Sequence, residues 1–362
     1  MVSSIGPIVN LTEVSKSDVI CYYALSDNDY NGHLGTRISS IFVILFVSTA
    51  FTVFPFASKR VKTLKVSRFA YTFARFFGSG VILATAFIHL LDPAYKRIGP
   101  RTCVGESGHW GDYSWCAAIV LASVLGIFSL DLAAEIYVER KYGQDKNENA
   151  LEAIFKGTST SQSQQLDGNP DDPPQEKQPR QSNAEKPQSS DSGSSHCVER
   201  SFRQQIAAFL ILEFGIIVHS VIIGLNLGVT GSEFATLYPV LVFHQSFEGL
   251  GIGARMSSIP FGKHIWLPWI LCAAYGLTTP VSIAVGLGVR TTYVPESKQA
   301  LMVQGILNAI SAGLLIYSAL VELLARDFLF DRNRSRRRSQ ILYMFSCMVF
   351  GAGIMSLIGF WA

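Results

Sequence analysis

Three ionisable side chains lie in stretches of the chain that are otherwise largely apolar: His219, His244 and Glu248. An ionisable group at membrane depth is costly, and it usually faces a polar cavity or a ligand. Imidazole nitrogen and carboxylate oxygen together suit a divalent first-row metal ion such as zinc or ferrous iron. Glu248 follows His244 by four residues, so both side chains project from the same face of a helix. We therefore predict that these three residues are metal ligands.

Neighbouring polar residues extend this candidate site. Ser220 and Gln245 adjoin the two histidines, and Asn226 lies seven residues after His219 on the same helical face. We include all three as further candidate metal ligands. The same pattern also fits a hydrogen-bonded packing cluster or a proton relay, and spacing does not separate these interpretations.

The composition indicates a membrane protein. Of the 362 residues, 49% are hydrophobic and 16% are charged, and the mean hydropathy is +0.28. A helix needs about 20 apolar residues to cross the hydrocarbon core. The net charge of +3 comes without a basic patch interleaved with aromatic residues, so we expect the lipid bilayer, and not nucleic acid, as a partner. We predict an all-α polytopic fold with eight transmembrane helices at residues 37–57, 68–92, 113–138, 205–229, 234–256, 265–289, 300–325 and 340–361.

The depth of the two histidines supports their proximity. His219 lies ten residues before the end of its helix near Val229, and His244 lies ten residues after the start of the next helix near Phe234. A turn of only a few residues joins these two helices. At about 1.5 Å per residue, both imidazoles reach the same depth. They are therefore predicted to be neighbours.

A long polar segment divides the predicted helices into three and five. Between residues 157 and 195 only Leu166 and Ala184 are apolar, and such a segment cannot bury a core. The sequence thus predicts four regions: an extracellular segment at 1–36, three helices within 37–138, a disordered cytosolic loop at 139–204, and five helices within 205–362 that carry the metal site.

Basic residues predict the orientation of the helices. The loops after the first and seventh helices are rich in Lys and Arg, which favours the cytosolic side. Both termini are then outside the cytosol. A glycosylation sequon at Asn10-Leu11-Thr12 agrees with this orientation.

Three of the six cysteines fall in predicted external segments, where disulfides are stable. Cys103 and Cys116 flank the loop after the second helix, and a disulfide between them is one expectation. Cys21 is an alternative partner for either residue.

Other polar residues suggest a route through the membrane. Thr85, His89 and Asp92 share one face of the second helix, and we assign His89 and Asp92 to the entrance. Asp131 and Glu135 are one turn apart in the third helix, and we assign them to the exit. In the alternative interpretation, these residues reach interfacial water at helix ends.

Small residues near the candidate ligands indicate close helix packing. Gly224 and Gly228 are four residues apart in one predicted helix, and Gly249, Gly251 and Gly253 follow Glu248 in the next. Such spacings let membrane helices approach each other closely.

Four stretches resemble a known family: "HSVIIGLNLG" (219–228), "HQSFEGLGIG" (244–253), "ATAFIHLLDPA" (84–94) and "NAISAGLLIYSALVELL" (308–324). The paired motifs at 219–228 and 244–253 are similar to those of the ZIP family of zinc and iron transporters, particularly its fungal and plant plasma-membrane branch. The resemblance extends over the chain outside the linker and the first 36 residues.

The resemblance implies a secondary transporter that moves zinc into the cytosol by alternating access, with ferrous iron or other first-row metals as further cargo. His219, His244 and Glu248 match the family's central metal ligands, and Ser220 and Gln245 lie beside them. It implies a multi-pass protein of the plasma membrane with both termini extracellular. Zinc is then cargo and no prosthetic group is required. A homodimer is compatible with the sequence.

Two departures from the family pattern limit this transfer. Many bacterial relatives carry a proline and a glutamate after the histidine of the fourth helix, whereas this chain has Val221, Ile222 and Ile223. A second, carboxylate-bridged metal is therefore not expected. The linker offers only His196 beside Cys197 where many relatives carry a histidine repeat.

Two other function classes are compatible with some of these residues. An intramembrane metal-dependent hydrolase could use Glu248 as general base, but the HExxH motif and a phosphate-binding loop are both absent from the sequence. A non-transporting metal sensor would have the same site without flux. The sequence leaves the preferred metal, the energy source and the choice between plasma and organelle membrane open.

Overall fold

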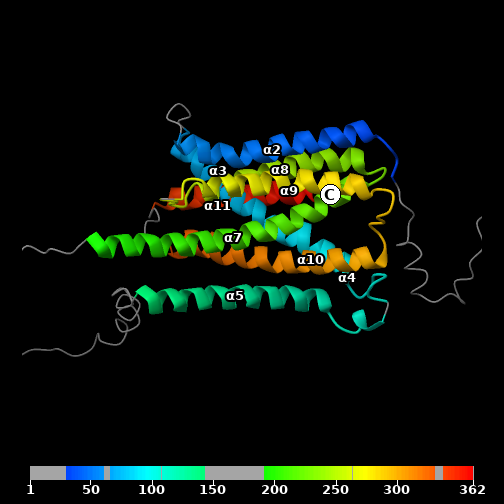
Figure 1. The fold of residues 1–362 in the computed structure, drawn as a ribbon. Helices are drawn as coiled ribbons and strands as arrows, with labels where there is room; N and C mark the ends of the chain where they lie inside the picture. The colour runs from blue at the N-terminus through cyan, green and yellow to red at the C-terminus, as the bar shows by residue number, and fades with distance from the viewer. Residues whose placement is uncertain are drawn as a thin grey trace, which may run out of the picture. The chain divides into compact units, whose positions relative to one another are not determined.

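The computed structural model describes residues 30–60, 66–106, 108–142, 191–262, 264–330 and 337–361, and all regular structure in these ranges is helical. Residues 1–131 and 205–362 form one compact unit, and residues 132–204 form a second. Within the first unit, the long helices run roughly alongside one another (Figure 1). The elements are α2 (Leu34–Arg60), α3 (Arg68–Ala84), η1 (Thr85–Leu91), α4 (Asp92–Ile98), η2 (Gly108–Trp110), α5 (Trp115–Tyr142), α7 (Asp191–Val229), α8 (Phe234–Met256), α9 (Leu267–Val289), α10 (Lys298–Tyr317), η3 (Ser318–Phe330) and α11 (Arg338–Ile358).

The described helices confirm the prediction of an all-α polytopic membrane protein. Seven of them are long and apolar enough to cross a bilayer, among them the continuous segments 68–98 and 298–330. The remaining predicted span is α8, which has the required length of 23 residues. Its polar residues lower its hydropathy, because it carries both His244 and Glu248 within one turn.

The ends of the long linker differ from the predicted boundaries. Helix α5 continues to Tyr142, and α7 begins at Asp191, so helices overlap both ends of the segment 139–204. Residues 143–190 lie outside the described part of the chain, as do residues 1–29 of the predicted extracellular segment.

Helix packing around the candidate site follows from small residues. Helix α2 packs along α8 and α9, α3 packs along α11 and α8, and α10 packs along α4 and η1. At Gly251 in α8, a Cβ atom would clash with the backbone of Gly78 in α3. Gly228 in α7 similarly meets the backbone of Gly286 in α9. The close approach predicted from the glycines is therefore confirmed.

Arg37, near the start of α2, binds the carbonyl groups at the end of α7. Its side chain is fully buried, and it donates hydrogen bonds to the backbone carbonyls of Leu227, Gly228 and Thr230. The guanidinium also lies over the ring of Phe234, 4.4 Å from its centroid. The last carbonyls of a helix have no partner within that helix, and a cation is favourable at this terminus. Arg37 thus joins α2, α7 and the start of α8.

The segment η1 interrupts the helix that carries His89. Residues 85–91 are π-helical, and α4 begins immediately after them with Asp92 and Pro93. Proline has no backbone N–H to donate to the preceding turn, so the regular hydrogen-bond ladder cannot continue there. Short π-helical segments of this kind are frequent at functional sites. Here the segment contains Thr85 and His89.

One prediction about the cysteines is wrong. Cys116 is a buried free thiol, whereas Cys103 is disulfide-bonded. These two residues are therefore not bonded to each other. Cys21 lies outside the described residues.

Candidate metal site

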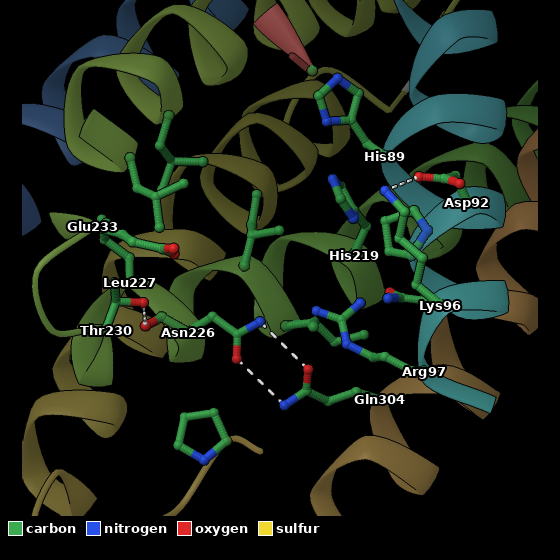
Figure 2. A pocket seen from close by; sticks show the side chains of 18 of the residues that line it. His89, Asp92, Lys96, Arg97, His219, Asn226, Leu227, Thr230, Glu233 and Gln304 are labelled. Carbon is green, nitrogen blue, oxygen red and sulfur yellow. Dashed lines mark hydrogen bonds and ion pairs between the residues drawn. The ribbon is translucent and has the colours of Figure 1, made fainter. Parts of the chain in front are cut away.

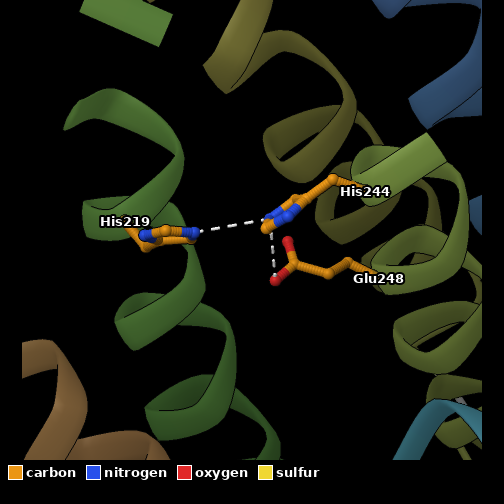
Figure 3. Close-up of side chains that lie close together, drawn as sticks. All are labelled: His219, His244 and Glu248. Atoms are coloured by element: carbon orange, nitrogen blue, oxygen red, sulfur yellow. Dashed lines mark hydrogen bonds and ion pairs between the residues drawn. The ribbon is translucent and has the colours of Figure 1, made fainter. Parts of the chain in front are cut away.

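His219, His244 and Glu248 converge at one place in the membrane-spanning region (Figure 3). His219 extends from α7, and the other two side chains extend from α8. The Nε2 atoms of the two histidines are 3.4 Å apart, and His244 Nε2 is 3.3 Å from Glu248 Oε1. One potential ligand atom from each residue lies within 4.8 Å of the others. In the described part of the chain, no other three His, Cys, Asp or Glu residues meet in this way.

The three side chains are almost completely buried. Their exposed fractions are 1% for His219, 3% for His244 and 0% for Glu248. Glu248 Oε2 and His219 Nδ1 have no hydrogen-bond partner. Buried polar atoms are normally paired, and an unpaired one is costly. Two imidazoles and one carboxylate with free lone pairs offer the ligand set that a divalent first-row ion prefers.

Segment η1 supplies two further residues to this site. Thr85 Oγ1 donates a hydrogen bond of 2.9 Å to Glu248 Oε1, which orients the carboxylate. The ring centroid of His89 is 4.9 Å from that of His244, and His89 Nε2 is 3.1 Å from the carbonyl oxygen of Met355. The sequence placed Thr85 and His89 on one helical face. It gave no sign that Thr85 contacts Glu248.

A pocket of about 460 Å³ opens beside the two histidines. His219 and His244 line it, and so do Thr230 and Glu233 from the turn between α7 and α8. Figure 2 shows His219, Thr230 and Glu233 around this pocket. The predicted entrance residues also line it, together with other polar groups: His89, Asp92, Lys96, Arg97, Asn226, Glu296, Gln304 and Asn308. The candidate metal site can therefore be reached from the end of the bundle that contains the α7–α8 turn.

Two predicted residues of this pocket have side-chain partners. Asn226 and Gln304 face each other across the pocket (Figure 2) and exchange amide hydrogen bonds of 3.3 and 3.4 Å. Asp92 forms an exposed ion pair of 2.7 Å with Lys96. The Asn226 amide is therefore bonded to α10 and is not a member of the cluster of His219, His244 and Glu248.

Gln245 and Ser220, the two residues next to the histidines, differ in their side-chain partners. Gln245 donates to Thr279 Oγ1 at 2.9 Å and accepts a hydrogen bond of 2.7 Å from the Tyr275 hydroxyl at Oε1. Both ends of its amide are thus occupied by α9. Ser220 is fully buried, and its hydroxyl has no partner.

The end of the bundle opposite the pocket contains buried charges that the sequence did not single out as a group. Asp327 in η3 lies 2.6 Å from Arg75 in α3 and 3.3 Å from Arg255 in α8. Arg255 also donates to the backbone carbonyl of Glu322. These contacts join three helices that are distant in sequence. Arginines in membrane helices are a signal of such pairing, but they do not reveal the partner.

The predicted exit residues fall into different units. Asp131 accepts a hydrogen bond of 2.7 Å from the hydroxyl of Tyr317 in α10. Glu135 is half-buried and belongs to the second unit, 132–204. The structure therefore connects Asp131 with α10, one of the helices around the candidate site.

The sequence is similar to a known protein family over most of its length. A family model described as "ZIP Zinc transporter" matches residues 34–359. Zinc-regulated transporter 1 of Saccharomyces cerevisiae is 52% identical over 97% of this chain and 93% of its own length. Zinc-regulated transporter 1 of Schizosaccharomyces pombe is 37% identical over 99% and 92% of the two chains. Fe(2+) transport protein 1 of Arabidopsis thaliana is 31% identical over 91% and 86%. No solved structure matches the chain.

Proposed function

The chain belongs to the ZIP zinc transporter family, and on that premise we propose that it moves zinc into the cytosol through a site formed by His219, His244 and Glu248. Members of this family are transporters and not enzymes, which removes the hydrolase alternative. Metal transport is thus its function class. The direction, the ligands and the mechanism are the content of our proposal.

One observation carries the proposal: three buried side chains that can bind a metal converge, and two of them, His219 and His244, line a pocket. Their burial would be costly without a ligand, since Glu248 keeps one unpaired carboxylate oxygen. A divalent cation would neutralise that charge. Neutral imidazoles bind it through ring nitrogens, while Thr85 holds the carboxylate in position.

The other predicted residues take supporting roles in this proposal. His89 and Asp92 receive the ion in the pocket, and Asn226 lines the same pocket. Gln245 stabilises the packing of α8 on α9, because its amide is already bonded there, and Ser220 keeps an unpaired hydroxyl and remains our candidate for a further ligand. Asp131 and Glu135 remain our candidates for the exit.

Alternating access fits the asymmetry of the two ends. The pocket reaches the histidines from the end with the α7–α8 turn, whereas ion pairs of Asp327 join α3, α8 and η3 at the other end. Release to that other end would require these ion pairs to separate. By the distribution of Lys and Arg, the pocket end is external and both termini are extracellular.

Zinc is the proposed main cargo and the plasma membrane the proposed location. Imidazole and carboxylate also bind ferrous iron, and an Arabidopsis relative is named as an Fe(2+) transport protein. Iron is therefore a second cargo to be tested by competition.

The decisive experiment is uptake of radiolabelled zinc by zinc-starved cells that express the wild type or His219→Ala. We expect uptake to fall to the background level while surface abundance is unchanged. His109→Ala is the matched control, because His109 is exposed and pairs only with the nearby Asp112. Excess iron or manganese as competitor ranks the metals.

Normal uptake by His219→Ala would contradict the proposed site. Zinc binding without uptake in the wild type would instead favour the metal sensor.

A further inference from the structure

A polar stripe runs down one face of the continuous helix formed by α10 and η3. Successive members are separated by four or three residues, which is the spacing of one helical face. The stripe begins at the pocket with Gln304 and ends beside the buried charges with Glu322. Its members are Gln304, Asn308, Ser311, Leu315, Ser318 and Glu322.

Three members of this stripe carry buried polar atoms without a partner. Asn308 Oδ1, Ser311 Oγ and Ser318 Oγ form no hydrogen bond, although these residues are only 2%, 0% and 1% exposed. Asn308 also lines the pocket. Unsatisfied polar groups are rare in a folded interior and call for an explanation. Inside a membrane, they usually face a route for an ion or a polar substrate.

Other serines in the membrane helices behave differently. Ser123, Ser282 and Ser356 each donate to the backbone carbonyl four residues earlier, at 2.7–2.8 Å. This bond satisfies a hydroxyl within its own helix. Ser311 and Ser318 do not make it, so their hydroxyls are available to a ligand.

The packing of α7 against α10 places the stripe at the candidate metal site. Asn226 pairs with Gln304, and a Cβ at Gly215 would lie 3.3 Å from the side chain of Leu315. These two contacts are eleven residues apart in each helix, from 215 to 226 and from 304 to 315. His219 lies four residues after Gly215, and Ser311 lies four residues before Leu315. The free Nδ1 of His219 and the free hydroxyl of Ser311 are thus at the same level of the bundle.

Leu315 is the apolar member of the stripe. It is fully buried, it packs on Gly215, and it separates Ser311 from Ser318. On the pocket side of Leu315 lie the metal ligands, and on the other side lie Ser318 and Glu322.

We propose that Asn308, Ser311 and Ser318 form an oxygen-lined track along which the divalent cation moves between the His219–His244–Glu248 site and the end of the bundle opposite the pocket, with Leu315 on Gly215 as the barrier. This inference rests on the proposed transport function. Neutral amide and hydroxyl oxygens can replace hydration water around an ion without holding it tightly, which favours movement over storage. Glu322 lies one turn beyond Ser318, where it forms an ion pair with Arg326.

The first test is zinc uptake by the double variant Ser311→Ala/Ser318→Ala. We expect at least about a fivefold loss of uptake at normal surface abundance, since two ion contacts are removed. The melting temperature should be unchanged or higher, because alanine removes hydroxyls that have no partner. Ser123→Ala/Ser356→Ala is the matched control, because its hydroxyls bond to their own helices, and its uptake should be normal.

The outcomes separate the track from the transport site. Uptake within twofold of the wild type, or a fall in uptake that follows a fall in melting temperature, would overturn the track. If His244→Ala in the same assay also transports normally, the proposed site itself has failed. If His244→Ala is inactive and the double variant is normal, only the track is wrong.

A second test addresses the barrier. Gly215→Ala adds a methyl group against Leu315, so we expect several-fold slower uptake with no loss of stability. Gly126→Ala in α5 is the control, because a Cβ there meets no atom within 4 Å. Equal uptake by Gly215→Ala and the control would exclude Leu315 as the barrier.

Discussion

The two ends of the helix bundle are held together by different chemistry. At the pocket end, α7 meets α10 through a pair of neutral amides at 3.3 and 3.4 Å. At the opposite end, α3, α8 and η3 meet through a buried aspartate and two arginines at 2.6 and 3.3 Å. Weak neutral contacts are easily exchanged for water, whereas buried charges lose much when they separate. The difference indicates that the pocket end opens at a lower cost in free energy than the opposite end.

The largest effect on zinc uptake is expected for substitution of a metal ligand, since the ligands lie between the two ends of the bundle. Glu248→Gln keeps the shape of the side chain but removes its charge, so zinc loses its only anionic ligand in the cluster. We expect uptake at the background level, with an intact fold. Zinc uptake normalised to surface abundance measures this, and Asp112→Asn at the protein surface serves as control. Normal uptake by Glu248→Gln would mean that Glu248 is not a ligand of the transported zinc.

The next largest effect is expected on stability, at the end of the bundle that contains Asp327, Arg75 and Arg255. Asp327→Asn leaves Arg75 and Arg255 without a buried counter-charge, which typically costs about 3–5 kcal/mol. We expect a clear decrease in the melting temperature of the purified protein in detergent. An unchanged melting temperature would show that the ion pairs do not hold the three helices together.

A smaller effect is expected for the neutral end. Gln304→Ala removes the amide pair with Asn226 and the contact with the Tyr293 hydroxyl. Polar contacts between membrane helices contribute about 0.6 kcal/mol on average. We therefore expect a melting temperature much closer to the wild type than that of Asp327→Asn. If the melting temperature of Gln304→Ala decreased more than that of Asp327→Asn, the amide pair would hold its end of the bundle more strongly than the ion pairs hold theirs.

The smallest effect should be at the mouth of the pocket. Lys96 and Asp92 are both exposed, and such ion pairs contribute about 0–1 kcal/mol. In Lys96→Gln, Asp92 is free to attract cations, so the KM for zinc should decrease by about twofold at low salt and less at high salt. A KM that does not depend on salt would argue against an electrostatic role for Asp92.

The central cluster could be predicted because its geometry is local. A short turn joins α7 and α8, so counting residues gives the depths of His219 and His244, and helical spacing gives Glu248. Helical spacing supports Gln245 and Ser220 less strongly. Each directly follows a histidine, and adjacent residues of a helix project about 100° apart.

Contacts between helices that are distant in sequence could not be predicted in this way. The bond from Thr85 to Glu248 and the ion pairs of Asp327 depend on which helices become neighbours, and periodicity does not encode that choice. The cysteines show the same limit. Proximity in sequence suggested Cys103 and Cys116 as a pair, but Cys116 is buried among apolar residues of the core.

Arg37 has a consequence for how the chain is made. This arginine lies in α2, but three of the carbonyls that accept its hydrogen bonds belong to residues 227, 228 and 230. During synthesis, almost two hundred residues must emerge before those partners exist. A nascent chain that ends at α5 can therefore bond this guanidinium only to nearby residues such as Asn31 and Gly32, and its contacts with the end of α7 form only after α7 has been made.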